Sequence, residues 1–98
     1  MTENMRTFRS ERIEDLIQQY LGELLVREFD FDGALTTIKS VEVDKELRIA
    51  KVKIGVIPFE KELATFILID SKKKELQGKL LRKLNIRPLP QIKFEIDR

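Results

Sequence analysis

Eight basic side chains lie between residues 72 and 93, a stretch in which Glu75 is the single acidic residue. They are Lys72, Lys73, Lys74, Lys79, Arg82, Lys83, Arg87 and Lys93. Eight positive groups and one negative group give this stretch a net charge of +7, although the formal net charge of the chain is only +2. Ammonium and guanidinium groups at this density bind phosphate, so the segment is suited to a polyanion, and nucleic acid is the first partner to consider.

The first half of the chain has the opposite charge. Residues 1–46 contain eleven acidic and six basic side chains, a net charge of −5. The field of such a molecule attracts a polyanion to one end of a small domain and repels it from the other. A bulk isoelectric point near 9.0 does not reveal this polarity.

The composition excludes most catalytic chemistry. The 98 residues include no Cys, His or Trp, so thiolate nucleophiles, imidazole bases and Cys/His zinc sites are ruled out. Asp30 with Asp32, and Asp44 with Glu46, are better interpreted as turn residues than as acid/base or metal pairs. The four glycines are too widely separated for a phosphate-binding loop or a GxxG loop. We therefore expect a binding protein that is not an enzyme and has no metal, cofactor or small-molecule substrate.

The length predicts one domain over residues 1–98, with a single two-layer core. The longest apolar run, Phe66 to Ile69, is far too short to span a bilayer, and the first residues do not resemble a signal peptide. We expect a cytoplasmic monomer with no membrane partner.

Periodicity predicts the elements that must position the basic residues. Apolar residues at three- and four-residue steps predict a first helix of about five turns, which Thr7 or Ser10 would cap and which would end at residues 30–33. These apolar residues are Ile13, Leu16, Ile17, Tyr20, Leu21, Leu24, Leu25 and Phe29. Residues 35–43 and 48–57 then predict a hairpin, with a bulge near Lys39 and Ser40, a turn at residues 44–46 and a stop at Pro58.

The second half predicts two helices and a strand. Residues 60–70 suit a buried strand or a helix, and we favour a helix because Leu63, Phe66 and Ile67 have helical spacing. A further helix is expected over residues 72–84, capped by Asp70 or Ser71, followed by a strand over residues 89–96. The order helix, strand, strand, helix, helix, strand fits an α+β fold, a three-stranded sheet with helices on one face, as in a type II KH domain.

Particular residues resemble one family that has this architecture. The run from Val41 to Val52 is similar to the strand-turn-strand signature of the ribosome-binding factor A family. A second pattern also resembles the family: a leucine-rich helix is followed by an arginine, a proline and a phenylalanine at the family's spacing. Arg9 and Arg12, at the start of the first predicted helix, resemble the family as well. The residues of this second pattern are Leu76, Leu80, Leu84, Arg87, Pro90, Ile92, Phe94 and Asp97.

The resemblance covers nearly the whole chain and implies a KH-like protein without the usual GxxG loop. It implies an assembly factor that binds the small (30S) ribosomal subunit and its 16S rRNA during late maturation and rRNA processing. It also places an interhelical corner at Asp70 and Ser71, running into Lys72 and Lys73. The alternatives are a KH-like RNA-binding or protein-interaction module that is not specific to the ribosome and, with little support, a carboxylate-dependent hydrolase.

The corner is the first candidate for RNA contact. Lys72, Lys73 and Lys74 would lie in the first turn of a helix, where the macrodipole is already positive and like charge costs stability. Free N–H groups together with three ammonium groups predict a phosphate site, although the lysines could simply be a solvated face.

The positive surface would continue along the last helix through Lys79, Arg82 and Lys83 to Arg87. Arg87 could hold a phosphate or could instead pair with the last carbonyls of the helix. Additional RNA contacts could come from the open face of the sheet, at Lys51, Lys53 and Lys93, where solvation is the simpler explanation. Most aromatic residues have core positions, so we expect recognition of RNA shape and backbone, with an affinity that falls as salt rises.

Overall fold

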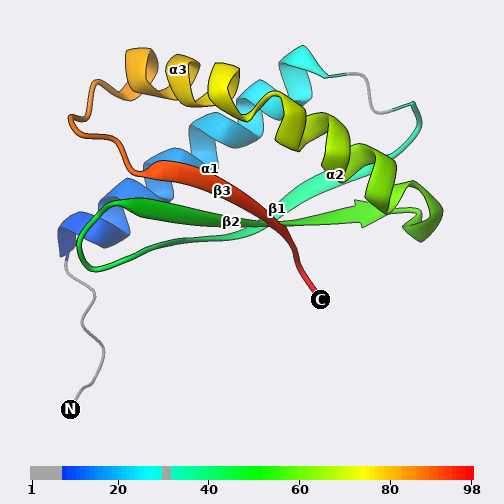
Figure 1. Cartoon of the computed structure of the whole chain (residues 1–98), viewed down its shortest axis with the longest axis horizontal. Coiled ribbons are helices and arrows are strands. Elements are labelled where there is room, and N and C mark those ends of the chain that lie inside the picture. Colours follow the sequence, from blue (N-terminus) through cyan, green and yellow to red (C-terminus); the bar gives the residue numbers. More distant parts are fainter. Residues whose placement is uncertain (1–7, 30–31) are drawn as a thin grey trace.

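The computed structural model describes residues 8–29 and 32–98 (Figure 1). The elements in chain order are α1 (Phe8–Glu28), β1 (Leu35–Val43), β2 (Ile49–Ile57), the 3-10 helix η1 (Phe59–Lys61), α2 (Glu62–Ser71), α3 (Lys73–Leu84) and β3 (Gln91–Ile96). The predicted α+β order of helices and strands is confirmed.

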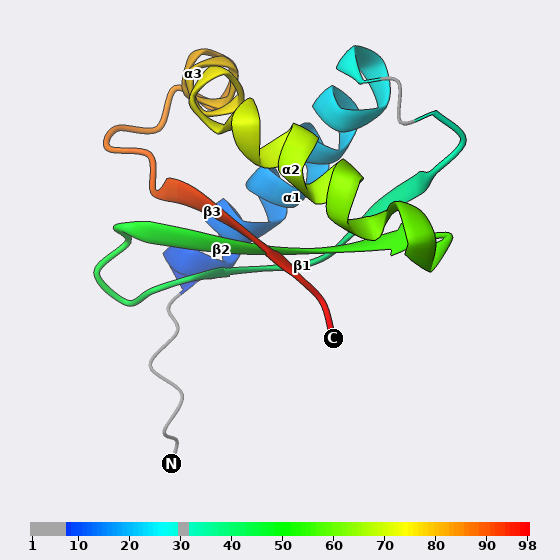
Figure 2. The ribbon, with the colours of Figure 1, turned by 45° about the vertical axis from the view of Figure 1, so that its right-hand side comes forward.

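The sheet has the order β1-β2-β3, with β1 and β2 antiparallel and β2 and β3 parallel. A parallel pair needs a crossover connection, which α2 and α3 supply. The three helices cover one face of the sheet (Figure 2). The fold expected of a type II KH-like domain is therefore present, with α3 and the α2–α3 corner on the helical side.

Strict alternation along β2 builds the centre of the core. Ala50, Val52, Ile54 and Val56 are buried against the helices, as predicted. From β3, Ile92 and Phe94 join the same layer. The alternate residues of both strands face the open side, which the helices leave uncovered.

The predicted bulge in β1 is present, because the register shifts between Ile38 and Ser40. The extra residue brings Ile38 to the same face as Val41 and Val43. Leu35, three residues before Ile38 with no bulge between them, remains on the open face and is 62% exposed. The prediction that one bulge reconciles all four apolar positions is therefore wrong for Leu35.

Asp44 organises the turn between β1 and β2. Its Oδ1 atom accepts hydrogen bonds from the N–H groups of Arg48 at 2.7 Å and Ile49 at 3.0 Å. These bonds, that of Ile49 first, lower the pKa of the Asp44 carboxyl group. Leu47 has a φ of 60°, which is unusual for a bulky residue, and its side chain packs against the core.

Helix α1 lies along the outer strand β1. The Val43 N–H group donates to the buried Glu14 Oε2 at 2.8 Å, and Gln18 Nε2 donates to the Ile38 carbonyl at 3.4 Å. Ser10 does not cap the helix, because the helix begins at Phe8 and Ser10 is buried within its first turn. Thr7 and Asp30, the other predicted boundary residues, lie outside the described residues.

Helix α2 buries only part of the face that its apolar spacing indicates. Thr65 and Ile69 are its buried residues and Phe66 packs partly buried against the core, whereas Leu63 and Ile67 are exposed. The helix itself, preferred over a strand in the sequence, is confirmed.

Gln77 joins α3 to the outer edge of β3. Its side-chain oxygen accepts the Ile92 N–H group at 2.8 Å, and its side-chain nitrogen donates to the Pro90 carbonyl at 2.9 Å. One amide side chain therefore satisfies a donor of β3 and an acceptor two residues earlier, just before the strand, whose other side pairs with β2.

Within residues 8–29 and 32–98, no helix is long and apolar enough to cross a membrane.

Candidate nucleic-acid interface

The corner between α2 and α3 is centred on Lys72, which both ends α2 and precedes α3. Its N–H group donates to the Ile69 carbonyl at 3.0 Å, and its own carbonyl accepts the Leu76 N–H group at 2.9 Å. Ser71 donates its hydroxyl back to the Leu68 carbonyl at 2.7 Å. The predicted cap at Asp70 or Ser71 is therefore wrong, because α3 begins without a side-chain cap.

The three corner lysines differ in how far their charge is compensated. Lys73 Nζ lies 4.0 Å from Asp70 Oδ1, whereas Lys72 and Lys74 are exposed and form no ion pair with any described residue. Two free ammonium groups therefore flank the uncapped first turn of α3.

Lys79 is compensated more fully than any other basic residue of α3. It donates a hydrogen bond to Glu28 Oε1 of α1, and it lies 3.7 Å from Glu75 Oε2 one turn earlier in α3. The hydrogen bond from Lys79 is the main cause of the lowered pKa of Glu28. In the free protein, Lys79 therefore links α3 to α1.

Arg82 and Lys83 carry the positive charge at the end of α3. Arg82 is exposed and forms no ion pair with any residue in the described ranges. Lys83 Nζ lies 5.1 Å from the centroid of the Tyr20 ring, a cation–π contact with α1. Both charges are favourable at a helix C-terminus, but their heads remain accessible.

Asn85, rather than Arg87, closes α3. Asn85 adopts a left-handed conformation with a φ of 53°, and its N–H group donates to the Leu81 carbonyl at 2.9 Å. Arg87 is exposed and makes no hydrogen bond to a described residue. The helix-closing alternative for Arg87 is therefore wrong, and its role as a phosphate contact stays a prediction.

The lysines on the open face of the sheet have neighbours of both signs. Lys51 is in register with Lys93 on one side and Glu42 on the other, and Lys53 is in register with Glu95. This face is therefore less positive than its lysines alone suggest, and it is separate from α3.

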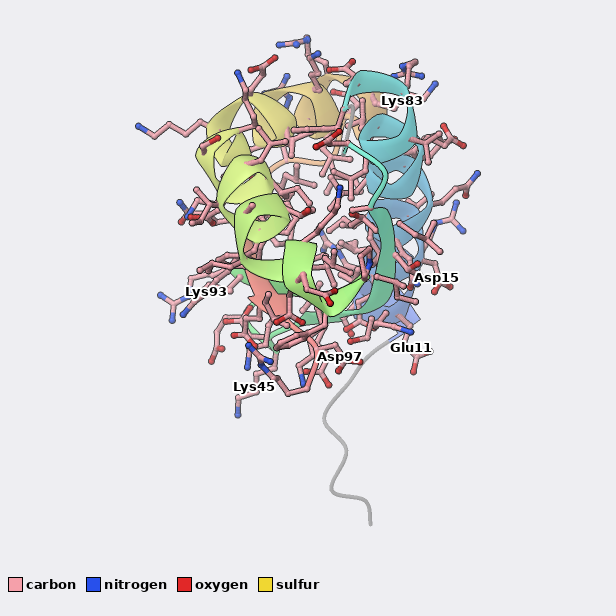
Figure 3. The ribbon with its side chains drawn as sticks, turned by 90° about the vertical axis from the view of Figure 1, so that its right-hand side faces the viewer. Glu11, Asp15, Lys45, Lys83, Lys93 and Asp97 are labelled. Carbon is pink, nitrogen blue, oxygen red and sulfur yellow. The ribbon has the colours of Figure 1, made fainter. Side chains whose placement is uncertain are left out.

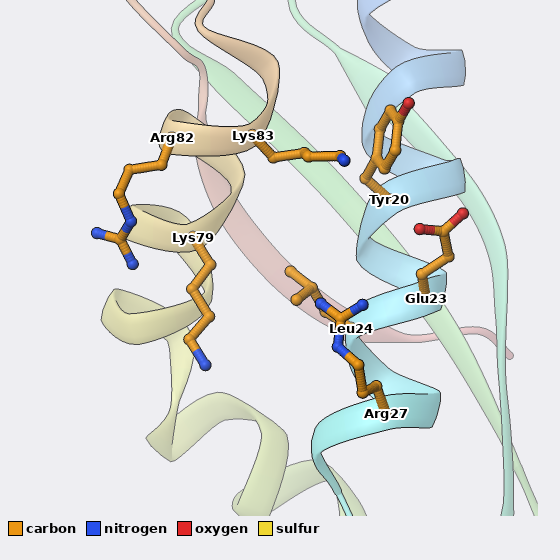
Figure 4. Close-up of a pocket in the computed structure, with 7 residues that line it drawn as sticks. All are labelled: Tyr20, Glu23, Leu24, Arg27, Lys79, Arg82 and Lys83. Atoms are coloured by element: carbon orange, nitrogen blue, oxygen red, sulfur yellow. The ribbon is translucent and has the colours of Figure 1, made fainter.

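Two hollows of about 300 Å³ each follow the seam between α1 and the α2–α3 pair. The first, called here the α1–α3 cleft, is lined from α1 by Tyr20, Glu23, Leu24 and Arg27 and from α3 by Lys79, Arg82 and Lys83 (Figure 4). The second lies nearer the corner and is lined by Glu28, Phe29, Leu68, Lys72, Glu75 and Leu76. Lys79 lines the first hollow and pairs with two carboxylates of the second.

Two residues that line the cleft, Tyr20 and Arg27, were not predicted as site residues from the sequence. Tyr20 has a core position in the helical period, and it does pack partly against the core, but it also lines the cleft. Arg27 belongs to the mostly acidic half of the chain, yet it faces the basic helix across the seam (Figure 4). In Figure 3, Lys83 lies near the top of the view and Asp15 and Glu11 lie below it, whereas Lys45 lies at the bottom, so the two signs of charge are only partly separated in space.

Comparison with known proteins identifies relatives along nearly the whole chain. The sequence model of a family described as ribosome-binding factor A matches residues 9–98. The ribosome-binding factor A of Chlorobium phaeobacteroides strain DSM 266 is 36% identical over 95 residues, which cover 94% of this chain and 82% of the relative. That of Akkermansia muciniphila is 26% identical over 89 residues, covering 91% and 71% respectively.

Solved structures share the fold at lower identity. The crystal structure of ribosome-binding factor A from Thermus thermophilus superposes with a TM-score of 0.73 at 19% identity, covering 89% of this chain and 94% of that one. A homology model of the same factor, fitted into a cryo-EM map of its complex with the 30S subunit, gives a TM-score of 0.74 at 20% identity, covering 86% of this chain and 90% of that one.

Proposed function

The chain belongs to the ribosome-binding factor A family, and on that premise we propose that it binds the small (30S) ribosomal subunit and its 16S rRNA during late maturation. Its work is assembly rather than catalysis, performed in the cytoplasm by a monomer. The relative from Thermus thermophilus, which has the same fold, is described in complex with the 30S subunit.

One observation in this chain supports a mechanism for RNA binding, namely a set of exposed basic side chains without carboxylate partners among the described residues. Lys72 and Lys74 at the corner, and Arg82 and Arg87 at the far end of α3, are exposed and form no ion pair with any described residue. Surface cations without a carboxylate partner can exchange their counterions for phosphates, which is the main source of affinity for RNA. The acidic side chains Glu11 and Asp15 of α1 lie below Lys83 of α3 in Figure 3, so RNA would approach from the side of the molecule on which Lys83 lies.

Co-sedimentation with purified ribosomal particles tests the proposal. The protein is mixed with small subunits, large subunits and joined ribosomes at low and at moderate salt. We expect selective recovery with the small subunit and weaker recovery as salt rises, because phosphate contacts dominate the affinity. Equal recovery with every particle would reduce the protein to a cationic RNA binder, and no recovery with any particle would remove the proposed function.

A protein-interaction module is the second candidate. It is favoured by an apolar stripe at four-residue steps, formed by the exposed side chains of Phe59, Leu63 and Ile67. In that case, association with the particle would survive nuclease digestion of the rRNA. If association instead disappears with the rRNA, the RNA-binding proposal is favoured.

A further inference from the structure

The α1–α3 cleft combines positive charge with an aromatic ring. Arg27, Arg82 and Lys83 are cations of its lining, and Glu23 is the lining carboxylate. Lys79 also lines it, but Glu28 and Glu75 already compensate that ammonium group, and Arg27 Nε lies 4.0 Å from Glu28 Oε2. Arg82 and Lys83 form no ion pair with any described residue, and the lining has one carboxylate for four cations, so the cleft keeps an excess of positive charge.

The neighbouring hollow at the corner provides an internal comparison. It has the same size of about 300 Å³, but its lining carboxylates, Glu28 and Glu75, face a single lining cation, Lys72, and both pair with Lys79 from the α1–α3 cleft. Two carboxylates against Lys72 and Lys79 leave no excess of positive charge for a phosphate, so size alone does not select an anion site. Of these two hollows, the α1–α3 cleft is the one whose charge suits a phosphate group.

Tyr20 and Leu24 give the cleft a surface that a simple anion would not need. The Tyr20 ring is partly exposed, and the side chain of Leu24 lies beside it on the same helix (Figure 4). Aromatic and apolar side chains next to cations match a nucleotide, which joins a planar base to a phosphate. About 300 Å³ lies at the low end of volumes for small-ligand sites, and it suits one nucleotide rather than a duplex.

We infer that the α1–α3 cleft takes one unpaired nucleotide of RNA, with its base against Tyr20 and its phosphates beside Arg27 and Arg82. This inference rests on the proposed function, because it names the part of the rRNA that the protein would hold: a single-stranded or flipped-out residue. Such bases are the ones that aromatic side chains can reach in RNA.

Lys83 is placed to exchange its present contact for the RNA. Its ammonium group now lies 5.1 Å from the centroid of the Tyr20 ring. Stacking of a base on an aromatic ring is stronger than an exposed cation–π contact, so the base can displace the ammonium group. The flexible stem of Lys83 then lets its charge move to a phosphate.

The chain offers an internal probe for this event. Tyr20 is the single tyrosine among the 98 residues, and the chain has no tryptophan. Its intrinsic fluorescence therefore reports on the cleft alone. We would titrate the whole protein with a uridine oligonucleotide and, separately, with inorganic polyphosphate, while filter binding or competition measures the affinity for each.

We expect the oligonucleotide to quench Tyr20 emission and polyphosphate to bind without comparable quenching. Replacing the ring in Tyr20→Leu should weaken oligonucleotide binding about fivefold or more, with polyphosphate binding unchanged within about twofold. Because Tyr20 also packs against the core, Arg82→Gln is the second variant. Its exposed side chain can be changed without loss of packing, and quenching should then require more oligonucleotide. Gln19→Ala, on the exposed surface of α1, is the matched control.

The outcomes separate this inference from the proposed function. If the oligonucleotide binds while Tyr20 emission stays constant, or if polyphosphate quenches equally well, the nucleotide cleft is wrong, whereas binding to the small subunit can still hold. Failure of the oligonucleotide to bind at all would also overturn the cleft. If the oligonucleotide quenches Tyr20 but the protein sediments with no ribosomal particle, the cleft stands and the proposed function falls.

Discussion

Lys79 of α3 donates a hydrogen bond to Glu28 in the last turn of α1, across 51 positions of sequence. The same ammonium group lies 3.7 Å from Glu75, so one lysine meets two carboxylates from two helices. In the protein without RNA, the ammonium group of Lys79 is therefore already paired with carboxylates. The basic surface consists of a corner group and a group at the end of α3, with this bridge between them.

The bridge predicts a pH dependence of stability. Lys79 lowers the pKa of Glu28 below its ordinary value of 4.5, so the native state favours the charged carboxylate. The stabilisation is present above the pKa of the unfolded chain and is lost as pH falls through the lower folded pKa. Glu28→Gln should lower the urea midpoint near neutral pH, and the difference from the parent should shrink in acid. Glu23→Gln, on the same helix, is the control and should show no such convergence, because Glu23 forms no ion pair with a described residue.

The hydrogen bonds of Gln77 predict a local cost in stability. Gln77→Ala would leave the Ile92 N–H group and the Pro90 carbonyl without this partner. The expected loss is about 1–3 kcal/mol in the free energy of unfolding, with faster amide exchange at Ile92. Gln19→Ala makes the same change on an exposed helical surface. Equal stability of the two variants would mean that water replaces Gln77 without cost.

The orientation of α2 predicts opposite results for two apolar residues six positions apart. Ile69 is fully buried, so Ile69→Ala should cost about 2–5 kcal/mol. Leu63 is 69% exposed, and Leu63→Ala should change stability by no more than about 0.5 kcal/mol. Chemical denaturation of both variants measures the two values. A large loss at Leu63 would show that its side chain is covered in solution.

The corner lysines predict a difference in RNA binding between two exposed lysines, Lys74 and Lys45. Lys74→Glu should weaken binding to the small subunit more than twofold, because a free cation beside the uncapped start of α3 is replaced by a repelling carboxylate. Lys45→Glu makes the same change in the β1–β2 turn, which lies on the opposite side of the view from Lys83 (Figure 3). Filter binding at two salt concentrations compares the two variants. Equal effects of the two variants would mean that RNA does not contact Lys74, or that only the total charge of the protein determines the affinity.

The strands could be predicted well because their patterns depend on local rules. A period of two fixes which residues of β2 are buried, and one interruption of that period located the bulge at Lys39. Pro58 and the Asp44 turn marked the strand ends for equally local reasons. Leu35 was misplaced because a single apolar residue at a strand end does not show which face it occupies.

The helices were located, but their contacts required the tertiary structure. Leu63 and Ile67 have helical spacing whether or not anything covers them, so spacing alone could not orient α2. The cap of α3 was mispredicted because Ser71 can also bond backwards within α2, as it does to Leu68. At the candidate site, the basic residues of α3 were visible in the sequence. The facing residues Tyr20 and Arg27 were not, because only the packing of α1 against α3 brings them there.

The hydrogen bonds of α1 to β1 and of Gln77 to β3 also limit how this protein can join other chains. Glu14 and Gln18 occupy backbone groups on one outer strand, and Gln77 does so on the other. An extended peptide would have to displace these side chains before it could add a strand, and so would a second copy seeking edge-to-edge association. At Ile38 and Val43 on one border and at Ile92 on the other, a partner therefore meets side chains rather than unpaired backbone groups.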